Sequence, residues 1–283
     1  MGDSAATPQP ADLGTARAAL EWVREAGELT LGHFGDPGLV VDRKGDGSPV
    51  TRADREAEAL LRRRIAAAHP EDAVHGEEGG HAPGSSGRTW VIDPIDGTLA
   101  FSHGVATYAN LLYLDDGLGP AVGIIHLPAL GETVWAARGH GCFRDDTPVR
   151  PAGRGEDAGG TGDEAGLDGR VLCVSGFHHW EPERFARVGD AGVLVRTWGD
   201  AYGYALVATG RADAMFDPVL EWWDLAAPMV VLAEAGATLT RGDGAPDPAV
   251  PHRRGPYGFS ALASNGGAHQ RWVELLGHEP DQP

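Results

Sequence analysis

A short apolar run that ends in two closely spaced carboxylates constrains this chain of 283 residues more than any other stretch. The run Trp-Val-Ile at 90–92 is typical of a buried strand, and Asp-Pro-Ile-Asp-Gly-Thr follows it at 93–98. An extended backbone would point Asp93 and Asp96 to opposite faces, but the proline and a turn can bring both carboxylates toward one point. Because two neighbouring anions repel each other unless a cation lies between them, the stretch predicts a metal site. Ligands that are all oxygen favour Mg²⁺ over Zn²⁺.

The composition limits the partners of such a site. The formal net charge of −18 argues against nucleic acid and against an anionic membrane surface as partners. It also means that a phosphorylated substrate needs bound cations in order to approach. No apolar run reaches the ~18 residues that span a bilayer, and the polar N-terminal segment lacks a signal-peptide pattern. Cys142 and Cys173 show no ligand spacing, so we expect free thiols in a reducing compartment, the cytoplasm.

The first part of the chain predicts helices followed by a sheet. Residues 1–10 predict a disordered tail, and residues 11–150 predict an N-terminal α+β half that carries the metal site. Apolar residues at helical spacing predict a helix over 11–34, and Thr51 can cap a second helix that runs to about Ala68. The expected strands are 39–41, 88–92, 108–114, 121–126, 133–137 and 142–144, the last four of them in an antiparallel sheet.

The second part of the chain predicts alternating strands and helices. Residues 151–169 are rich in Gly, Asp and Glu and predict a flexible loop with little to bury. Residues 170–283 predict a C-terminal α/β half, because strand and helix patterns alternate there. The expected strands are 171–174, 193–196, 212–216 and 237–239, the expected helices are 182–188, 201–209 and 223–234, and a strand–helix pair is expected over 259–276.

Two further carboxylates extend the predicted metal site. Glu77 lies in a turn flanked by glycines, and Asp224 begins an apolar helix whose N-terminal dipole stabilises an anion. Taken alone, Glu77 also fits a solvated loop, and Asp224 also fits a helix cap. The pair Asp93 and Asp96 is more specific, because a buried strand end is an unfavourable place for two unpaired carboxylates.

In the order and spacing of these motifs, the chain resembles the inositol monophosphatase family of magnesium-dependent, lithium-sensitive phosphatases. The resemblance runs from about residue 12 to about residue 275. It implies a layered αβαβα sandwich and a homodimer. The matching segments are 76–78, 90–98, 221–227 and 234–236, together with Lys44 and 49–54, which resemble the family's lysine loop and its Thr-x-x-Asp segment.

The resemblance also implies roles for individual residues. The metal ligands, for two or three Mg²⁺ ions, would be the side chains of Glu77, Asp93, Asp96 and Asp224 and the backbone carbonyl of Ile95. Glu77 and Thr98 would polarise the attacking water, and Asp54 would hold water around a weaker third ion. The amides of Gly97 and Thr98 would bind phosphate at the start of a helix. The implied reaction is in-line hydrolysis without a covalent phospho-enzyme, because the ions activate the water and stabilise the leaving alkoxide.

The segment at 196–204 indicates which phosphate ester is bound. Inositol phosphatases of the family usually carry Gly-Thr-Ala there, whereas this chain resembles the family's histidinol-phosphate phosphatases, with Gly-Asp followed by aromatic residues. Asp217 matches a position that contacts the alcohol portion of the substrate. Histidinol phosphate carries an ammonium and an imidazole, so Asp200, Asp217 and Glu221 could pair with its positive charge. Tyr202 could stack on its ring.

The sequence leaves alternatives open at the substrate pocket and in the overall function. Asp200 could instead cap the helix that starts near Ala201, with Tyr202 and Tyr204 in the core, and this role is compatible with substrate contact. We predict a Mg²⁺-dependent phosphomonoesterase that hydrolyses L-histidinol phosphate in histidine biosynthesis. One alternative is a phosphatase for inositol 1-phosphate or another small phosphorylated alcohol. Another is a catalytically silent binding protein on the same scaffold, against which the complete ligand set and Thr98 both count.

Overall fold

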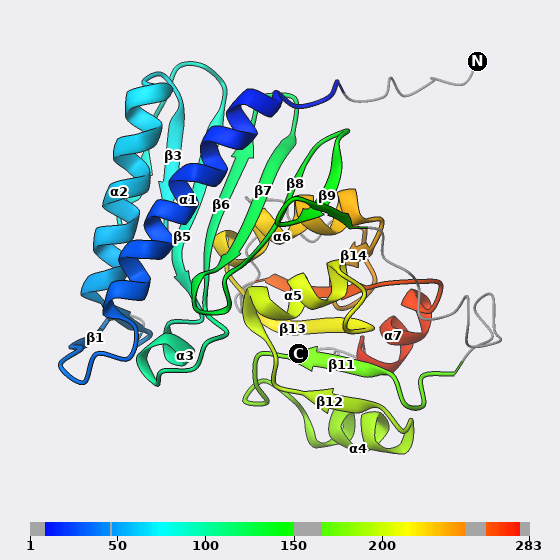
Figure 1. Ribbon diagram of the computed structural model, residues 1–283. Coiled ribbons are helices and arrows are strands. Elements are labelled where there is room, and N and C mark those ends of the chain that lie inside the picture. The colour runs from blue at the N-terminus through cyan, green and yellow to red at the C-terminus, as the bar shows by residue number, and fades with distance from the viewer. Residues whose placement is uncertain (1–8, 46, 150–165, 247–258, 278–283) are drawn as a thin grey trace, which may run out of the picture.

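The computed structural model, which describes residues 9–45, 47–149, 166–246 and 259–277, consists of alternating layers of helices and sheets (Figure 1). The helices are α1 (Leu13–His33), α2 (Arg52–Ala68), α3 (Thr98–Ser102), α4 (Pro182–Asp190), α5 (Asp200–Ala208), α6 (Trp222–Ala235) and α7 (His269–Leu276), with a 3₁₀ turn at Pro128–Leu130. Helices α1 and α2 cover the outer face of a large sheet, α5 and α6 lie between this sheet and a smaller one, and α4 and α7 cover the small sheet. The layering confirms the predicted αβαβα sandwich.

The large sheet is built from the chain before residue 150 and the small sheet from the chain after residue 170. In spatial order the large sheet consists of β10 (Thr147–Val149), β9 (Gly141–Arg144), β8 (Glu132–Ala137), β7 (Pro120–Leu127), β6 (Ala109–Asp115), β5 (Thr89–Asp96), β3 (Ala73–Gly76) and β4 (Gly80–Ala82). The small sheet consists of β12 (Leu194–Arg196), β11 (Val171–Val174), β13 (Ala214–Leu220), β15 (Phe259–Ser264) and β14 (Thr238–Thr240), and β1 (Val41–Arg43) pairs with β2 (Pro49–Thr51). The predicted antiparallel sheet over β6 to β9 is confirmed.

Several boundaries differ from those predicted. The strand expected at 39–41 begins only at Val41, and the strand expected to end at Ile92 continues to Asp96. Four short strands were not predicted: β2, β3, β4 and β10.

The structure describes only part of the predicted tail and of the predicted loop. Residues 1–8 and 150–165 lie outside the described residues. In the remainder of the loop, Leu167 is buried in the apolar cluster between the small sheet and helices α4 and α7. The expectation that this segment has little to bury is therefore wrong at Leu167. Within the described ranges, no helix combines the length and the apolar character that a membrane span requires.

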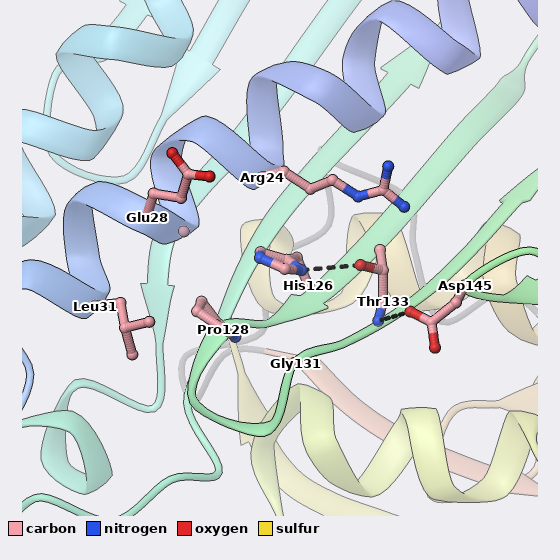
Figure 2. A pocket seen from close by; sticks show the side chains of 9 residues that line it. Arg24, Glu28, Leu31, His126, Pro128, Gly131, Thr133 and Asp145 are labelled. Atoms are coloured by element: carbon pink, nitrogen blue, oxygen red, sulfur yellow. Dashed lines mark hydrogen bonds between the residues drawn. The ribbon is translucent and has the colours of Figure 1, made fainter.

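Helix α1 packs closely on β7 at Gly27. A Cβ atom at Gly27 would lie 2.4 Å from Nε2 of His126, a side chain of β7 whose Nδ1 lies 2.9 Å from Thr133 Oγ1. Burial, assisted by the charge of Arg24, lowers the pKa of His126 to about 4, so the ring is neutral at neutral pH. These residues line a hollow of about 380 Å³ beside the helix (Figure 2). The glycine is needed for space, because the imidazole lies where a larger side chain would be.

We expect Gly27→Ala to lower the free energy of unfolding by about 1–3 kcal/mol, the usual cost of overpacking, even though alanine is the better helix former by about 1 kcal/mol. Gly32→Ala is the matched control, since Gly32 lies in the same helix with no atom within 4 Å of the added Cβ. That control should leave stability unchanged or raise it slightly. Chemical denaturation of both variants checks the prediction, and equal stabilisation of the two would contradict it.

Candidate metal centre and active site

Asp93 and Asp96 lie at the end of β5, where the strand changes register against β6. Asp93 pairs with Leu111 and Asp96 with Ala109, so β5 has one residue more than β6 between the two pairs. This extra residue is a β-bulge, which resets the alternation of side chains. Both carboxylates can therefore point to the same side of the sheet, as predicted. The break in alternation comes from a bulge within the strand rather than from a turn after it.

The bulge is anchored by a buried amide side chain. Asn110 Nδ2 donates a hydrogen bond to the carbonyl oxygen of Pro94, and Thr30 Oγ1 of α1 donates to Asn110 Oδ1 over 3.5 Å. Asn110 and Thr30 are both fully buried. On the other side of the bulge, Asp93 Oδ1 accepts from the amide of Ile95 at 3.1 Å. The segment between the two aspartates is thus fixed by hydrogen bonds to Asn110 of the neighbouring strand β6 and to the Asp93 side chain.

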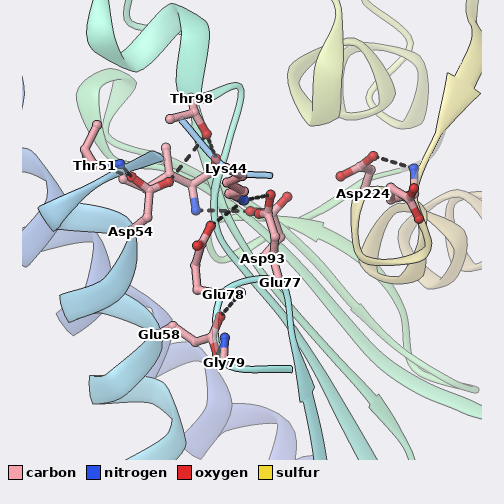
Figure 3. Close-up of polar contacts among 12 residues, drawn as sticks. Lys44, Thr51, Asp54, Glu58, Glu77, Glu78, Gly79, Asp93, Thr98 and Asp224 are labelled. Atoms are coloured by element: carbon pink, nitrogen blue, oxygen red, sulfur yellow. Dashed lines mark hydrogen bonds and ion pairs between the residues drawn. The ribbon is translucent and has the colours of Figure 1, made fainter. Parts of the chain in front are cut away.

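Helix α6 brings a third carboxylate to the same point. Asp224 lies in the first turn of α6, where its Oδ2 accepts from the amide of Glu221 at 2.7 Å in a capping box. Carboxylate oxygens of Asp93, Asp96 and Asp224 all lie within 4.8 Å of one another, and we call these three residues the aspartate cluster. Figure 3 shows Asp93 and Asp224 on their separate elements.

The electrostatics of the aspartate cluster fit a bound divalent cation. Burial raises the pKa of Asp93 well above its ordinary value, and the charges of Glu77 and Asp96 raise it further. Burial likewise raises the pKa of Asp96 and of Asp224, with repulsion from the neighbouring carboxylates adding to each shift. A cation among the three would favour their ionised forms and remove the repulsion. Because the ligands are carboxylates, the cluster suits a hard cation.

A lysine pairs with the glutamates beside the cluster. Glu77 and Glu78 lie in the loop between β3 and β4, and Lys44 Nζ forms ion pairs with Oε1 of each, at 2.6 Å for Glu78 (Figure 3). Burial raises the pKa of Glu77, although the Lys44 hydrogen bond opposes this. Burial also disfavours the charged form of Lys44, but its hydrogen bonds to the two glutamates outweigh that effect, so its pKa is raised. The Lys44 ammonium shows that a cation is accommodated at Glu77.

Asp54 and Thr98 meet next to the bulge. Thr98 Oγ1 donates to the carbonyl of Ile95 at 3.0 Å and lies 3.4 Å from Asp54 Oδ1. Asp54 is fully buried at the start of α2, where the predicted cap is confirmed: its Oδ2 accepts from the amide of Thr51 at 2.7 Å. Burial raises the pKa of Asp54. Gly97, which precedes α3, has a φ of 77°, a left-handed conformation that glycine adopts at little cost.

A narrow pocket of about 80 Å³ extends from the aspartate cluster toward α5. Two more aspartates, Asp200 and Asp217, line it, and Ser175 connects them. The Asp200 amide donates to Ser175 Oγ at 2.8 Å, and Ser175 Oγ in turn donates to Asp217 Oδ1 at 2.6 Å. Tyr204 donates its hydroxyl to Asp217 Oδ2 at 2.9 Å. Burial raises the pKa of Asp217 to about 7, although these hydroxyl donors oppose the shift.

The structure excludes one of the roles left open for Asp200. The N-cap of α5 is Gly199, and no side chain forms a cap hydrogen bond there, so Asp200 does not cap the helix. Its own φ is +53°, an unusual conformation for a residue with a side chain. The next amide, that of Ala201, donates to Asp96 Oδ2 at 2.7 Å, which ties this strained turn to the aspartate cluster. Strain of this kind is often found where function requires it.

The aromatic residues near Asp200 divide into two environments. Tyr204 is buried, as the core interpretation predicted, but its hydroxyl also reaches the pocket. Tyr202 is half-buried against the apolar cluster between the sheets and is not among the residues that line the pocket. Glu221 forms the capping box with Asp224 and likewise does not line the pocket. Sequence reasoning missed Ser175 as a site residue, because a lone serine after a strand carries no distinctive signal.

Comparison with known proteins finds relatives that match most of the chain. Residues 14–276 match the model of the inositol monophosphatase family. The chain is 43% identical over 218 residues to a histidinol-phosphatase of Chlorobaculum parvum, covering 77% of this chain and 82% of that protein. It is 40% identical to a histidinol-phosphatase of Mycobacterium tuberculosis, covering 91% of this chain and 96% of that protein.

A solved structure shares the architecture. The extragenic suppressor protein suhB from Bartonella henselae superposes with a TM-score of 0.79 at 24% identity, covering 94% of this chain and 100% of that one. The family match over residues 14–276, the two relatives and the αβαβα layers agree with one another. This protein therefore belongs to the inositol monophosphatase family of phosphomonoesterases.

Proposed function

We propose that this protein is a Mg²⁺-dependent phosphatase that hydrolyses L-histidinol phosphate to L-histidinol and phosphate. The observation that carries the substrate assignment is the pair Asp200 and Asp217 in the pocket that opens on the aspartate cluster. A phosphate held at the cluster would place the rest of a small substrate in this pocket. Carboxylates there suit an ammonium or imidazolium group, whereas an uncharged cyclitol would supply no positive charge to compensate them. The names of the relatives from C. parvum and M. tuberculosis support the same substrate.

The metal ligands we propose are Asp93, Asp96, Asp224, Glu77 and the carbonyl of Ile95, for two or three ions. Bound Mg²⁺ would supply an acidified water and neutralise the charge that develops on the leaving oxygen. Glu77, within reach of a cation as its Lys44 contact indicates, would orient the attacking water and accept its proton.

The residues around the bulge would hold the phosphate and water in line. Thr98 Oγ1, which already donates to Ile95, would share the positioning of the water with Glu77. Asp54 would orient Thr98 and hold water around a third ion. The Gly97 and Thr98 amides would donate to phosphate oxygens, by resemblance to the family. On the same ground we expect a homodimer in the cytoplasm.

We expect Asp96→Asn to abolish phosphate release and weaken Mg²⁺ binding by at least tenfold, because it removes a charged ligand. The same change should raise the melting temperature of the protein in excess chelator, because it removes one of three mutually repelling carboxylates. The Asn oxygen can still accept from the Ala201 amide, so the local fold should persist. Calorimetric titration with Mg²⁺ and thermal unfolding in chelator measure both effects. Full activity in this variant, or in wild type with chelator, would contradict the mechanism.

A panel of phosphate esters tests the substrate assignment. Histidinol phosphate should show a higher kcat/KM than inositol 1-phosphate and than a neutral ester of similar size, because it alone supplies a cation to the two pocket aspartates. Phosphate release from each ester at saturating Mg²⁺ gives the comparison. If inositol 1-phosphate were hydrolysed equally well, the broader alternative, a phosphatase of small phosphorylated alcohols, would be correct.

We expect Asp200→Asn to reduce kcat/KM for histidinol phosphate about 10- to 100-fold, the usual range for losing a hydrogen bond to a charged group, and to reduce it much less for a neutral ester. Asn tolerates the left-handed backbone of this position, so the fold should be kept. Asp200→Gly is the companion variant: it should lose the same discrimination while raising stability by relieving the backbone strain. Equal losses on charged and neutral esters would instead indicate that Asp200 acts only on the shape of the site.

A further inference from the structure

The loop that carries Glu77 is held by a side chain outside the aspartate cluster. Strands β3 and β4 are joined by the loop 77–79, and Glu58 of α2 reaches its backbone (Figure 3). Glu58 Oε2 accepts from the amide of Glu78 at 2.7 Å, and Glu58 Oε1 accepts from the amide of Gly79 at 2.8 Å. One carboxylate therefore binds two successive amides of the loop next to Glu77.

Arg62, one helical turn further along α2, completes this contact. Its Nε donates to Glu58 Oε1 at 2.7 Å, and its Nη2 donates to the carbonyl of Gly80. Together, Glu58 and Arg62 bind two amides of the hairpin, those of Glu78 and Gly79, and one carbonyl, that of Gly80. Glu58 is only 2% exposed, and its two oxygens accept three hydrogen bonds. Its charge is compensated by Arg62, as that of Glu77 is by Lys44. Unlike Glu77, Glu58 binds the loop backbone and not a member of the aspartate cluster.

The two glycines of the hairpin allow this close approach. A Cβ atom at Gly76 would lie 2.3 Å from Glu58 Oε1, and one at Gly79 would lie 2.6 Å from the same oxygen. The carboxylate therefore lies directly against the loop backbone. Gly76 and Gly79 were predicted only as part of a turn, but their lack of a side chain also makes room for Glu58.

Helix α2 connects this contact with the other side of the site. Asp54 and Glu58 are four residues apart and so lie on the same face of the helix. Asp54 contacts Thr98 beside the bulge, and Glu58 contacts the loop that carries Glu77. The relative positions of Thr98 and Glu77 are thus fixed through one rigid element.

We propose that Glu58 is a positioning residue that holds the backbone of the 77–79 loop, so that the Glu77 carboxylate is already placed for the metal ion before the ion binds. The proposal rests on the proposed function, because it gives Glu77 the role of a metal ligand. It predicts that weakening the Glu58 contact lowers metal affinity. Groups that orient metal ligands without touching the metal typically contribute 10- to 100-fold to affinity or activity.

The test is Glu58→Gln, which keeps the shape of the side chain but replaces one accepting oxygen by an amide group that cannot accept from the loop. Its Mg²⁺ affinity, measured by calorimetric titration of the full chain, should fall by 10-fold or more. Phosphate release should need correspondingly more Mg²⁺, with kcat largely restored at saturating Mg²⁺. Glu56→Gln is the matched control, because Glu56 lies on the same helix and pairs only at the surface with Arg52 and His33.

A second variant guards against loss of folding. Arg62→Lys keeps the positive charge but loses the guanidinium fork that joins Glu58 to Gly80, and it should weaken Mg²⁺ binding in the same direction by a smaller factor. Unchanged Mg²⁺ affinity in a folded Glu58→Gln protein, or in Arg62→Lys if the first does not fold, would overturn the proposal. A lower melting temperature without a change in affinity would also overturn it. Absence of Mg²⁺ binding or phosphate release in the wild type would instead contradict the proposed function.

Discussion

Repulsion among buried carboxylates is the constraint around which this structure is organised. Asp93, Asp96 and Asp224 come from two elements of different layers, and each is placed where burial and its neighbours disfavour its charge. Hydrophobic burial in the layers on both sides must hold them together, because nothing in the cluster itself is attractive without a cation. A cation bound among the three would remove this repulsion.

The scaffold places each charge by a local device. A bulge in β5 turns two aspartates to one side, a capping box fixes Asp224 at the start of α6, and a second capping box fixes Asp54 at the start of α2. These devices use backbone amides, which carry no net charge and so do not compete with the metal ion for the carboxylates. The pocket is also fixed by local contacts. Asp200 lies in a left-handed turn, and Ser175 accepts from its amide and donates to the Asp217 carboxylate.

The sequence predicted well what local patterns encode. Helical periodicity located α1, α2 and α6, and a Thr-x-x-Asp segment predicted the cap at Thr51. The paired aspartates after an apolar run predicted a site of clustered carboxylates, and the structure brings together three that could hold a metal ion. It could not show that Asp200 adopts a left-handed conformation rather than a cap, since that follows from contacts with Ser175 and Asp96. The contact of Glu58 with the 77–79 loop could not be predicted for the same reason, because the two amides that it binds lie about twenty positions away along the chain.

Because Asp54 and Glu58 lie on one helix, the packing of α2 affects the positions of both residues and of the groups that they contact. The same face of α2 packs on α1 and on the large sheet through Ala57, Leu61 and Ile65. A tilt of this helix by its neighbours would displace Thr98 and the loop that carries Glu77 together. A substitution in the outermost layer can therefore change the geometry beside the aspartate cluster without contacting it.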